Sequence, residues 1–150
     1  MASDPLIWEQ HPDSDRYQRG VFDRLFAESL ASGGALAVVE RTGGTIVGSS
    51  RFNAYDPAAS RIEIGWSYLA RAYWGGAYNA ELKRLMLRHA FAFVKEVVFV
   101  IGSQNLRSQR AIEKLGAVRT GSRRDAAGRE SFVYTIRAED GNPRGPERPS

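Results

Sequence analysis

The middle of the chain contains a strand–helix–strand pattern, and no other feature of the sequence restricts its fold as much. Residues 61–69 alternate apolar and polar side chains as a half-buried strand does, and a helical apolar stripe runs through residues 78–93. Residues 97–101 form a continuous apolar run, which is typical of a central strand covered on both faces. The pattern therefore predicts an α/β domain in which helices pack on a sheet.

Predicted hairpins flank this unit on both sides. They comprise residues 35–40 with 45–55, and residues 118–124 with 131–137. A helix from residue 13 or 14 to residue 32 precedes the first hairpin, and another helix ends at Leu115-Gly116 before the second. Hairpins around a strand–helix–strand unit imply a mixed sheet.

The periodicity also predicts which side chains share a face. In the strand at 61–69, strict alternation places four side chains on one side, namely Ile62, Ile64, Trp66 and Tyr68. In the helix at 78–93, the apolar stripe comprises Leu82, Leu85, Met86, His89 and Phe93. On this pattern His89 is a packed histidine, whereas His11 lies beside Pro12 in a loop and is expected to be exposed.

Composition excludes several classes of protein. The chain has no cysteine and only two histidines, so a thiolate nucleophile and a zinc site are both disfavoured, and no metal is predicted. No apolar stretch is long enough to span a bilayer, and the first residues do not form a secretory signal, so we expect a cytoplasmic protein without membrane contact. The net charge of +4 favours an anionic ligand but does not identify it.

Two loops that lead from a strand to a helix are suited to an anion. They span residues 69–79, which contain Gly75-Gly76, and residues 102–107. Helix N-termini offer unpaired N–H groups and a partial positive charge to a phosphate. A tight turn without a ligand is equally compatible with the glycine pair. The G-x-G-x-x-G, P-loop and G-x-S-x-G motifs are absent, which disfavours dinucleotide, P-loop and serine-hydrolase functions.

Three segments resemble the GNAT superfamily of N-acetyltransferases, in the RimJ/RimL-like branch that acetylates ribosomal-protein N-termini. Residues 62–66 resemble the fourth strand of that fold, residues 73–79 its pyrophosphate loop, and residues 105–117 the loop and helix that follow its fifth strand. The resemblance covers roughly residues 3–137. Two positions depart from the family pattern, because Ala77 replaces a glycine and Asn79 a small residue. The family's first strand is also missing, so the strand at Ala35 is expected to be an open edge.

The resemblance implies a fold and a cofactor. The fold is a twisted mixed sheet of about six strands, splayed in the middle, with helices on both faces. It forms one domain over residues 1–137, followed by a disordered tail at 138–150. The co-substrate is acetyl-CoA, inserted between the strands at 63–69 and 97–101. The implied cofactor-binding residues are Ser67, Tyr68, Leu69, Trp74, Gly75, Gly76, Ala77, Tyr78, Asn79, Asn105 and Ser108.

Catalysis would require a base, an oxyanion site and an acid. Glu63 occupies the position of a base that acts through water, although it can instead hold backbone or an arginine such as Arg61. The N–H near Ser67 suits the oxyanion if a bulge turns it into the cleft. Many relatives protonate the thiolate with a tyrosine that this helix lacks, so Ser108 either serves the sulfur or caps the helix.

The resulting prediction is an N-acetyltransferase that acts on a primary amine, either a protein N-terminus or a small molecule, by direct attack in a ternary complex. A catalytically weak or inactive acyl-CoA-binding module remains an alternative, and a basic nucleic-acid-binding domain is less favoured. Arg107, Arg110 and Lys83 are candidates for contact with the 3′-phosphate of the cofactor. The open edge strand leaves a homodimer as a further expectation.

Overall fold

The computed structural model describes residues 1–139. In chain order its elements are α1 (Pro5–Trp8), α2 (Arg19–Ser32), β1 (Ala35–Val39), β2 (Ile46–Asp56), β3 (Arg61–Leu69), the 3₁₀ turn η1 (Arg71–Tyr73), α3 (Tyr78–Ala90), β4 (Glu96–Gly102), α4 (Leu106–Glu113), β5 (Val118–Arg124) and β6 (Glu130–Arg137). Residues 140–150, in which most of the predicted tail falls, lie outside the described residues.

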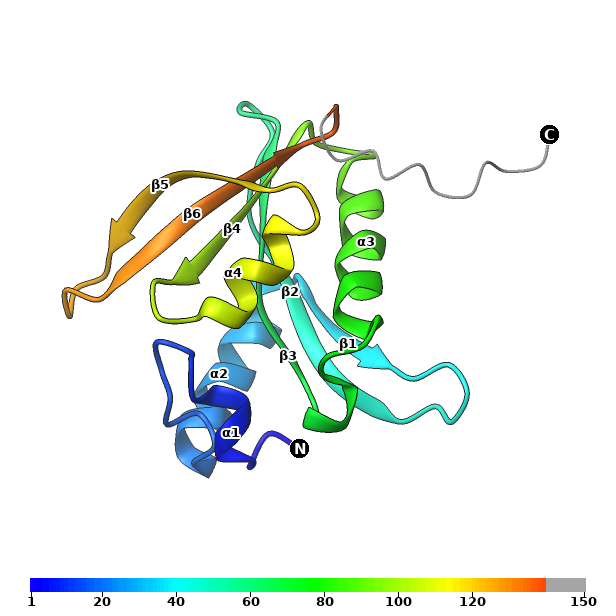
Figure 1. Cartoon of the computed structure of the whole chain (residues 1–150), viewed down its shortest axis with the longest axis vertical. Coiled ribbons are helices and arrows are strands. Elements are labelled where there is room, and N and C mark those ends of the chain that lie inside the picture. Colours follow the sequence, from blue (N-terminus) through cyan, green and yellow to red (C-terminus); the bar gives the residue numbers. More distant parts are fainter. Residues whose placement is uncertain (140–150) are drawn as a thin grey trace.

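The six strands form one mixed sheet in the order β1-β2-β3-β4-β6-β5 (Figure 1). Every neighbouring pair is antiparallel except β3 with β4, which are the two strands joined through α3. The predicted mixed sheet is thus confirmed, and its parallel pair lies at the centre. The outer strands are β1 and β5, so the first predicted strand does lie at an edge.

The sheet is splayed between β3 and β4, as expected. These strands pair only where Arg61–Glu63 lie beside Glu96–Val98. Beyond Glu63 they separate, whereas β4 continues to pair with β6 along its whole length, from Glu96 to Gly102. The divergence opens a gap between the two halves of the sheet, and that gap positions the site described below.

Helices cover both faces of the sheet. On one face, Met86 and Leu87 of α3 and Ile112 of α4 pack with Phe99 of β4 in the main hydrophobic cluster. On the other face, α1 and α2 form a second cluster, whose buried members are Ile7, Trp8 and Leu25. Among the described residues, no helix combines the length and hydrophobicity needed to cross a membrane.

A bulge in β3 makes the predicted alternation wrong. Trp66 has φ +51°, and the pairing of β3 with β2 shifts by one residue between the pairs Arg51–Gly65 and Ser49–Tyr68. The extra residue reverses the faces of everything that follows it. Ile64 therefore packs in the main cluster, whereas Trp66 and Tyr68 pack against the cluster of α1 and α2.

The predicted stripe of α3 is also wrong in part. Leu85 is 50% exposed and Phe93, which lies beyond the end of the helix, is 68% exposed. The residues that α3 buries are Lys83, Met86, Leu87 and Ala90. A lysine in the buried stripe interrupted the apolar periodicity, so the pattern was assigned to the adjacent face. His89 is exposed rather than packed in the core and contacts the rings of Phe52 and Phe93.

Helix α2 begins at Arg19 rather than at residue 13 or 14. The residues before it form turns, one of which is closed by the hydrogen bond from the Gln18 N–H to the Asp15 carbonyl at 2.9 Å, and ion pairs also hold this segment. Asp13 binds Arg16 at 2.9 Å and Arg129 at 2.8 Å, and Arg129 also donates to the carbonyl of Pro12 at 2.7 Å. These distant contacts, which local periodicity cannot reveal, hold the N-terminal segment beside the C-terminal hairpin.

Candidate cofactor and catalytic site

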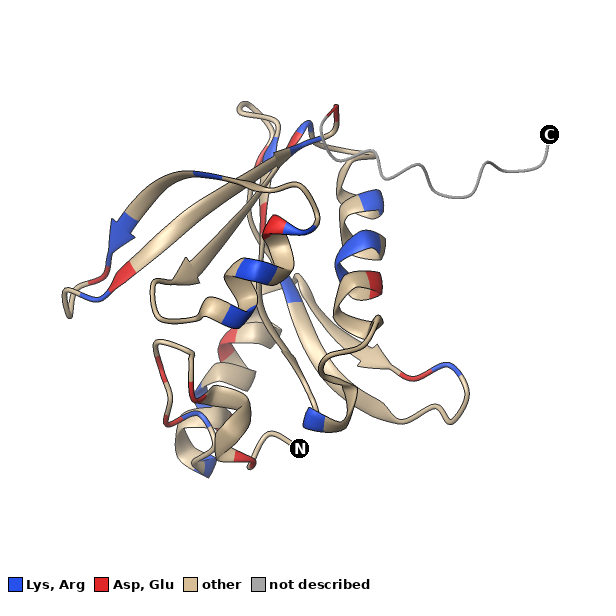
Figure 2. Ribbon diagram, viewed as in Figure 1, with Lys and Arg blue, Asp and Glu red and all other residues tan. Residues whose placement is uncertain are grey.

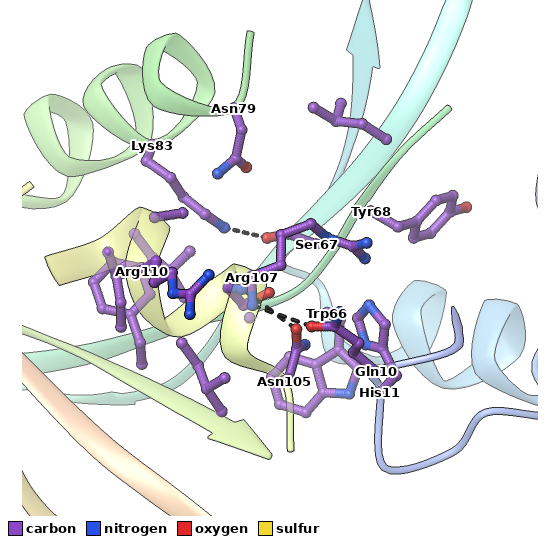
Figure 3. Close-up of a pocket in the computed structure, with 18 of the residues that line it drawn as sticks. Gln10, His11, Trp66, Ser67, Tyr68, Asn79, Lys83, Asn105, Arg107 and Arg110 are labelled. Atoms are coloured by element: carbon purple, nitrogen blue, oxygen red, sulfur yellow. Dashed lines mark hydrogen bonds between the residues drawn. The ribbon is translucent and has the colours of Figure 1, made fainter. Parts of the chain in front are cut away.

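A cleft of about 790 Å³ opens where β3 and β4 separate. Its walls are residues 63–69 of β3, residues 99–102 of β4, the start of α3 with the loop before it, and α4. The N-terminal segment around Gln10 and His11 forms another wall (Figure 3). The cleft therefore lies where the sequence placed the cofactor, between the strands at 63–69 and 97–101.

Most of the predicted site residues line this cleft. Those that do so are Glu63, Ser67, Tyr68, Leu69, Trp74, Gly75, Gly76, Asn79, Asn105 and Ser108. Ala77 and Tyr78 are absent from the lining. Ala77 is the residue that precedes the first turn of α3, and the Tyr78 ring turns toward Tyr73, with centroids 4.9 Å apart. Only the backbone at these two positions is therefore available for a role at the helix N-terminus.

The loop before α3 is fixed by side chains around it. The indole of Trp74 donates to the Leu69 carbonyl at 2.9 Å, and the guanidinium of Arg107 lies over its ring at 3.8 Å. Gly75 has φ +71°, a conformation that disfavours other residues. A Cβ at Gly76 would contact only a ring carbon of Tyr78 at 3.8 Å, so packing does not require glycine there. Open space at Gly76 suits the close approach of a ligand.

The bulge brings Ser67 next to two polar side chains. Its hydroxyl is 2.7 Å from that of Ser50, which is fully buried in β2. The ammonium of Lys83 donates to the same Ser67 oxygen from α3. Figure 3 shows Lys83 and Asn79 extending from α3 into the cleft. The predicted bulge is thus present, and Trp66 and Ser67 line the cleft.

Lys83 is the functional candidate whose position sequence reasoning missed. Lys83 is only 5% exposed, and burial lowers the pKa of its ammonium to about 8. The sequence considered it only as a weak ligand for a cofactor phosphate, whereas the structure directs it to Ser67 near the ring of Phe99. The available signal was a lysine among the residues of α3 that pack against the core. Because the predicted apolar stripe lay on a different face of the helix, this signal could not be recognised.

Glu63 is half-buried at the base of the cleft. Burial raises the pKa of its carboxyl, while Asn53, Arg123 and Arg51 oppose that rise. Arg61 is not its partner, because Arg61 binds Glu96 instead, with a nitrogen–oxygen distance of 2.6 Å. Arg61 is therefore not held by Glu63, and the Glu63 carboxyl lines the cleft with an elevated pKa.

At the start of α4 the structure separates two roles that the sequence left open. The Asn105 side chain accepts from the Ser108 N–H at 3.3 Å and so caps the helix. Ser108 is therefore not the cap, and it lines the cleft. Gln109 holds the preceding loop by donating to the carbonyls of Gly102 and Ser103, each at 3.0 Å.

The expectation that His11 is exposed is wrong. It is half-buried, lines the cleft, and lies edge-on to Trp8 with ring centroids 5.3 Å apart. Burial, together with the positive charges of Arg16 and Arg107, lowers the pKa of His11 to about 4. Its imidazole is therefore neutral at physiological pH.

Positive charge predominates in the cleft. Among the described residues that line it, six are basic and one, Glu63, is acidic; the basic residues are Arg16, Lys83, Arg84, Arg107, Arg110 and Lys114. Figure 2 shows basic residues along α3 and α4, the helices that border the cleft. Clefts lined by one sign of charge concentrate ligands of the opposite sign. The site is thus suited to an elongated ligand with several negative charges.

Comparison with known proteins agrees with this geometry. Residues 1–118 match the family model of the acetyltransferase (GNAT) domain. A protein from T. thermophilus, assigned as an acetyltransferase, is 32% identical, with 83% of this chain and 70% of that chain covered and a TM-score of 0.68. A second structure with the same assignment is 30% identical, with 91% and 77% covered and a TM-score of 0.73.

Mycobacterium smegmatis RimJ in complex with CoA-disulfide shares the fold, with 20% identity, 84% of this chain and 65% of that chain covered, and a TM-score of 0.64. Among curated proteins, none matches the chain. The family model nevertheless spans most of the chain, and it agrees with the two structures of at least 30% identity. The chain therefore belongs to the GNAT acetyltransferase family.

Proposed function

We propose that the protein transfers an acetyl group from acetyl-CoA to a primary amine by direct attack in a ternary complex. Acetyltransferases of this family use acetyl-CoA as the acetyl donor. The observation that carries the proposal is the cleft between β3 and β4, which is lined by six basic side chains and one carboxylate. A CoA ligand has several phosphate charges and one extended arm, and the cleft offers complementary charge and shape.

The residues of the cleft would hold the cofactor in a defined direction. The N–H groups at the start of α3, reached through Gly75 and Gly76, would bind the diphosphate. The backbone of Ser67–Leu69 would lie along the pantetheine arm, because β4 does not pair with β3 there. When bound, acetyl-CoA supplies the activated thioester. The Ala77 methyl group does not line the cleft, which removes one reason to expect weakened binding.

Glu63 would accept the proton that the unprotonated amine loses as its nitrogen bonds to the acetyl carbon, directly or through a water molecule. An elevated pKa brings a carboxyl closer to the pH at which it can exchange protons efficiently. The N–H near Ser67, turned by the bulge at Trp66, would stabilise the oxyanion of the tetrahedral intermediate. Glu63 and Ser67 both line the cleft, so the base and the oxyanion donor would act on one reacting centre.

The acceptor is proposed to be a protein N-terminal amine or a small-molecule amine in the cytoplasm. The resemblance of residues 73–79 and 105–117 to the ribosomal-protein branch favours the first. A weak or inactive acyl-CoA-binding module is the second candidate, favoured by Asn79, whose amide occupies a cleft position where the family has a small residue. A basic nucleic-acid-binding surface is less favoured, because the basic side chains gather inside a cleft. A dimer would form through the open edge of β1.

Isothermal titration with acetyl-CoA tests the proposal. We expect saturable one-to-one binding of acetyl-CoA and of desulfo-CoA, and much weaker binding of ATP, which has phosphates but no pantetheine arm. A screen of peptide N-termini and small amines, with detection of released thiol, would then identify the acceptor. If ATP bound as well as acetyl-CoA, the cleft would be a general phosphate site and the proposal would fail. Binding without turnover on any acceptor would favour the binding module.

A further inference from the structure

Lys83 has surroundings that a structural lysine does not need. Its ammonium is buried against the ring of Phe99, at 5.8 Å from the centroid, and its hydrogen-bond partner is the neutral hydroxyl of Ser67. Among the ion pairs of residues 1–139, none includes Lys83. Burying an ammonium without an anion is costly. The cost is understandable if an anion, or a charge that develops during the reaction, completes the site.

The position of Lys83 indicates which part of a ligand it would meet. It lies one turn after Asn79 on the same face of α3, so it is placed one turn farther from Gly75 and Gly76 than Asn79 is. Its nitrogen reaches Ser67, at the bulge where β3 has separated from β4. A ligand whose diphosphate lies at Gly75-Gly76 and whose arm follows β3 would bring its reacting end to this place.

We propose that Lys83 is the acid that protonates the departing thiolate of CoA. This inference rests on the proposed acetyl transfer. As the amine nitrogen bonds to the acetyl carbon, the carbon–sulfur bond breaks and its electron pair passes to sulfur. Lys83 gives one N–H proton to that sulfur and becomes neutral, while Glu63 takes the proton that the amine loses. After the products leave, water returns a proton to Lys83 and removes one from Glu63, so the reaction balances.

The chemistry of Lys83 supports this role over that of Ser108. Burial lowers the pKa of Lys83 to about 8, close to the value of about 8.5 that is usual for a thiol, which favours proton transfer between them. An ammonium also attracts a developing thiolate through its full positive charge, which the neutral hydroxyl of Ser108 lacks.

The other titratable groups that line the cleft are Glu63, Tyr68 and Tyr73 near β3, His11 and Arg16 from the N-terminal segment, and Arg84, Arg107, Arg110 and Lys114 from the helices and the turn after α4.

The thiol of bound CoA provides a readout that does not depend on turnover. Its ionisation is followed by the ultraviolet absorbance of the thiolate while pH is varied. In the wild type, the ammonium beside the sulfur should lower the thiol pKa by about one unit or more relative to free CoA. In Lys83→Met, which places an unbranched apolar side chain beside Phe99, the thiol pKa should return to that of free CoA or rise above it. Desulfo-CoA should bind both proteins equally, which shows that the cleft is intact.

Two further variants separate charge from proton donation. Lys83→Arg keeps a positive charge but does not release its proton, so it should still lower the thiol pKa while turnover falls. Lys95→Met is the matched control, because Lys95 is exposed and its side chain lies outside the cleft. It should behave as the wild type in both measurements.

Each result has a definite meaning. A thiol pKa that is the same in wild type and Lys83→Met, with CoA bound to both, overturns the role of Lys83 and leaves acetyl transfer standing. Full turnover by Lys83→Arg also overturns it. Acetylation of Lys83 itself, detected by mass spectrometry after incubation with acetyl-CoA, would make it an acceptor instead of an acid. Failure of the wild type to bind either CoA or desulfo-CoA would overturn both proposals together.

Discussion

Replacing Lys83 by methionine should stabilise the folded protein at neutral pH. The pKa of Lys83 falls from 10.5 to about 8 on folding because of desolvation. That difference corresponds to about 3 kcal/mol of unfavourable free energy when the ammonium is charged in the folded state. The variant also loses the hydrogen bond to Ser67, worth about 1 kcal/mol. The net expectation is an increase of about 2 kcal/mol in the free energy of unfolding at pH 7.

The gain should disappear as pH rises. Because the folded pKa of Lys83 lies below its unfolded value, the unfolded chain binds more protons between pH about 8 and pH 10.5. The stability of the wild type therefore rises with pH through this window, whereas the contribution is missing in Lys83→Met. The difference between the two proteins should shrink above pH 8. Near pH 10.5 the wild type should be equally stable or slightly more stable.

Urea unfolding of wild type, Lys83→Met and the control Lys95→Met at pH 7 and pH 10 measures this difference. At pH 7 the melting temperature of Lys83→Met should also rise, by about 4–8 °C for a domain of this size. A variant that is less stable than the wild type at pH 7 would refute the reasoning about desolvation. So would a difference that is the same at both pH values.

Three other predictions concern the cleft. Glu63→Gln should lower turnover and leave the acetyl-CoA dissociation constant unchanged in calorimetry, and equal turnover would remove Glu63 from the mechanism. In the wild type, kcat/KM should fall as pH drops through the raised pKa of Glu63, above 4.5, and this acidic fall of the pH profile should be absent in the variant. Gly76→Ala should leave the melting temperature nearly unchanged, since the new Cβ meets only Tyr78 at 3.8 Å, but should weaken acetyl-CoA binding in calorimetry; unchanged affinity would place the diphosphate elsewhere. Asn105→Ala should cost about 1 kcal/mol in urea unfolding because it removes the cap of α4, whereas Ser108→Ala should not, and the reverse order would contradict the capping geometry.

Local sequence patterns were sufficient for most of the sheet. The predicted bounds of β3 and β5 coincide with the observed ones, because turn residues and alternation are properties of neighbouring positions. The left-handed glycine that follows α4 was also predicted, and Gly116 has φ +96°. Features that depend on distant partners were not accessible in this way. The segment before α2, for example, is held by an ion pair between Asp13 and Arg129, which are far apart in the sequence.

The same limit applies to the candidate site. Resemblance placed Glu63, Ser67, Gly75 and Gly76 at the cleft, and these four residues line it. A bulge was expected to turn a backbone N–H into the cleft, and the bulge is present at Trp66. The reversal of the side chains that follow it was not predicted, because the alternation pattern treated the whole strand as regular. The burial of Lys83 was missed because a charged residue is ordinarily assigned to the solvent face. Burial of a charge depends on the tertiary environment, which periodicity does not encode.

The separation of β3 from β4 gives the folded sheet two internal edges. Within residues 1–139, β3 and β4 pair over a short stretch in which Arg61–Glu63 lie beside Glu96–Val98, and this pairing joins β1, β2 and β3 to β4, β5 and β6. Units joined so sparsely tend to open separately, and their amide protons then exchange with solvent at different rates. A ligand arm bound between these edges would serve as a surrogate strand and couple the two units. Amides on both sides of the gap would then gain protection together, so cooperativity in this fold would depend on the occupancy of the cleft.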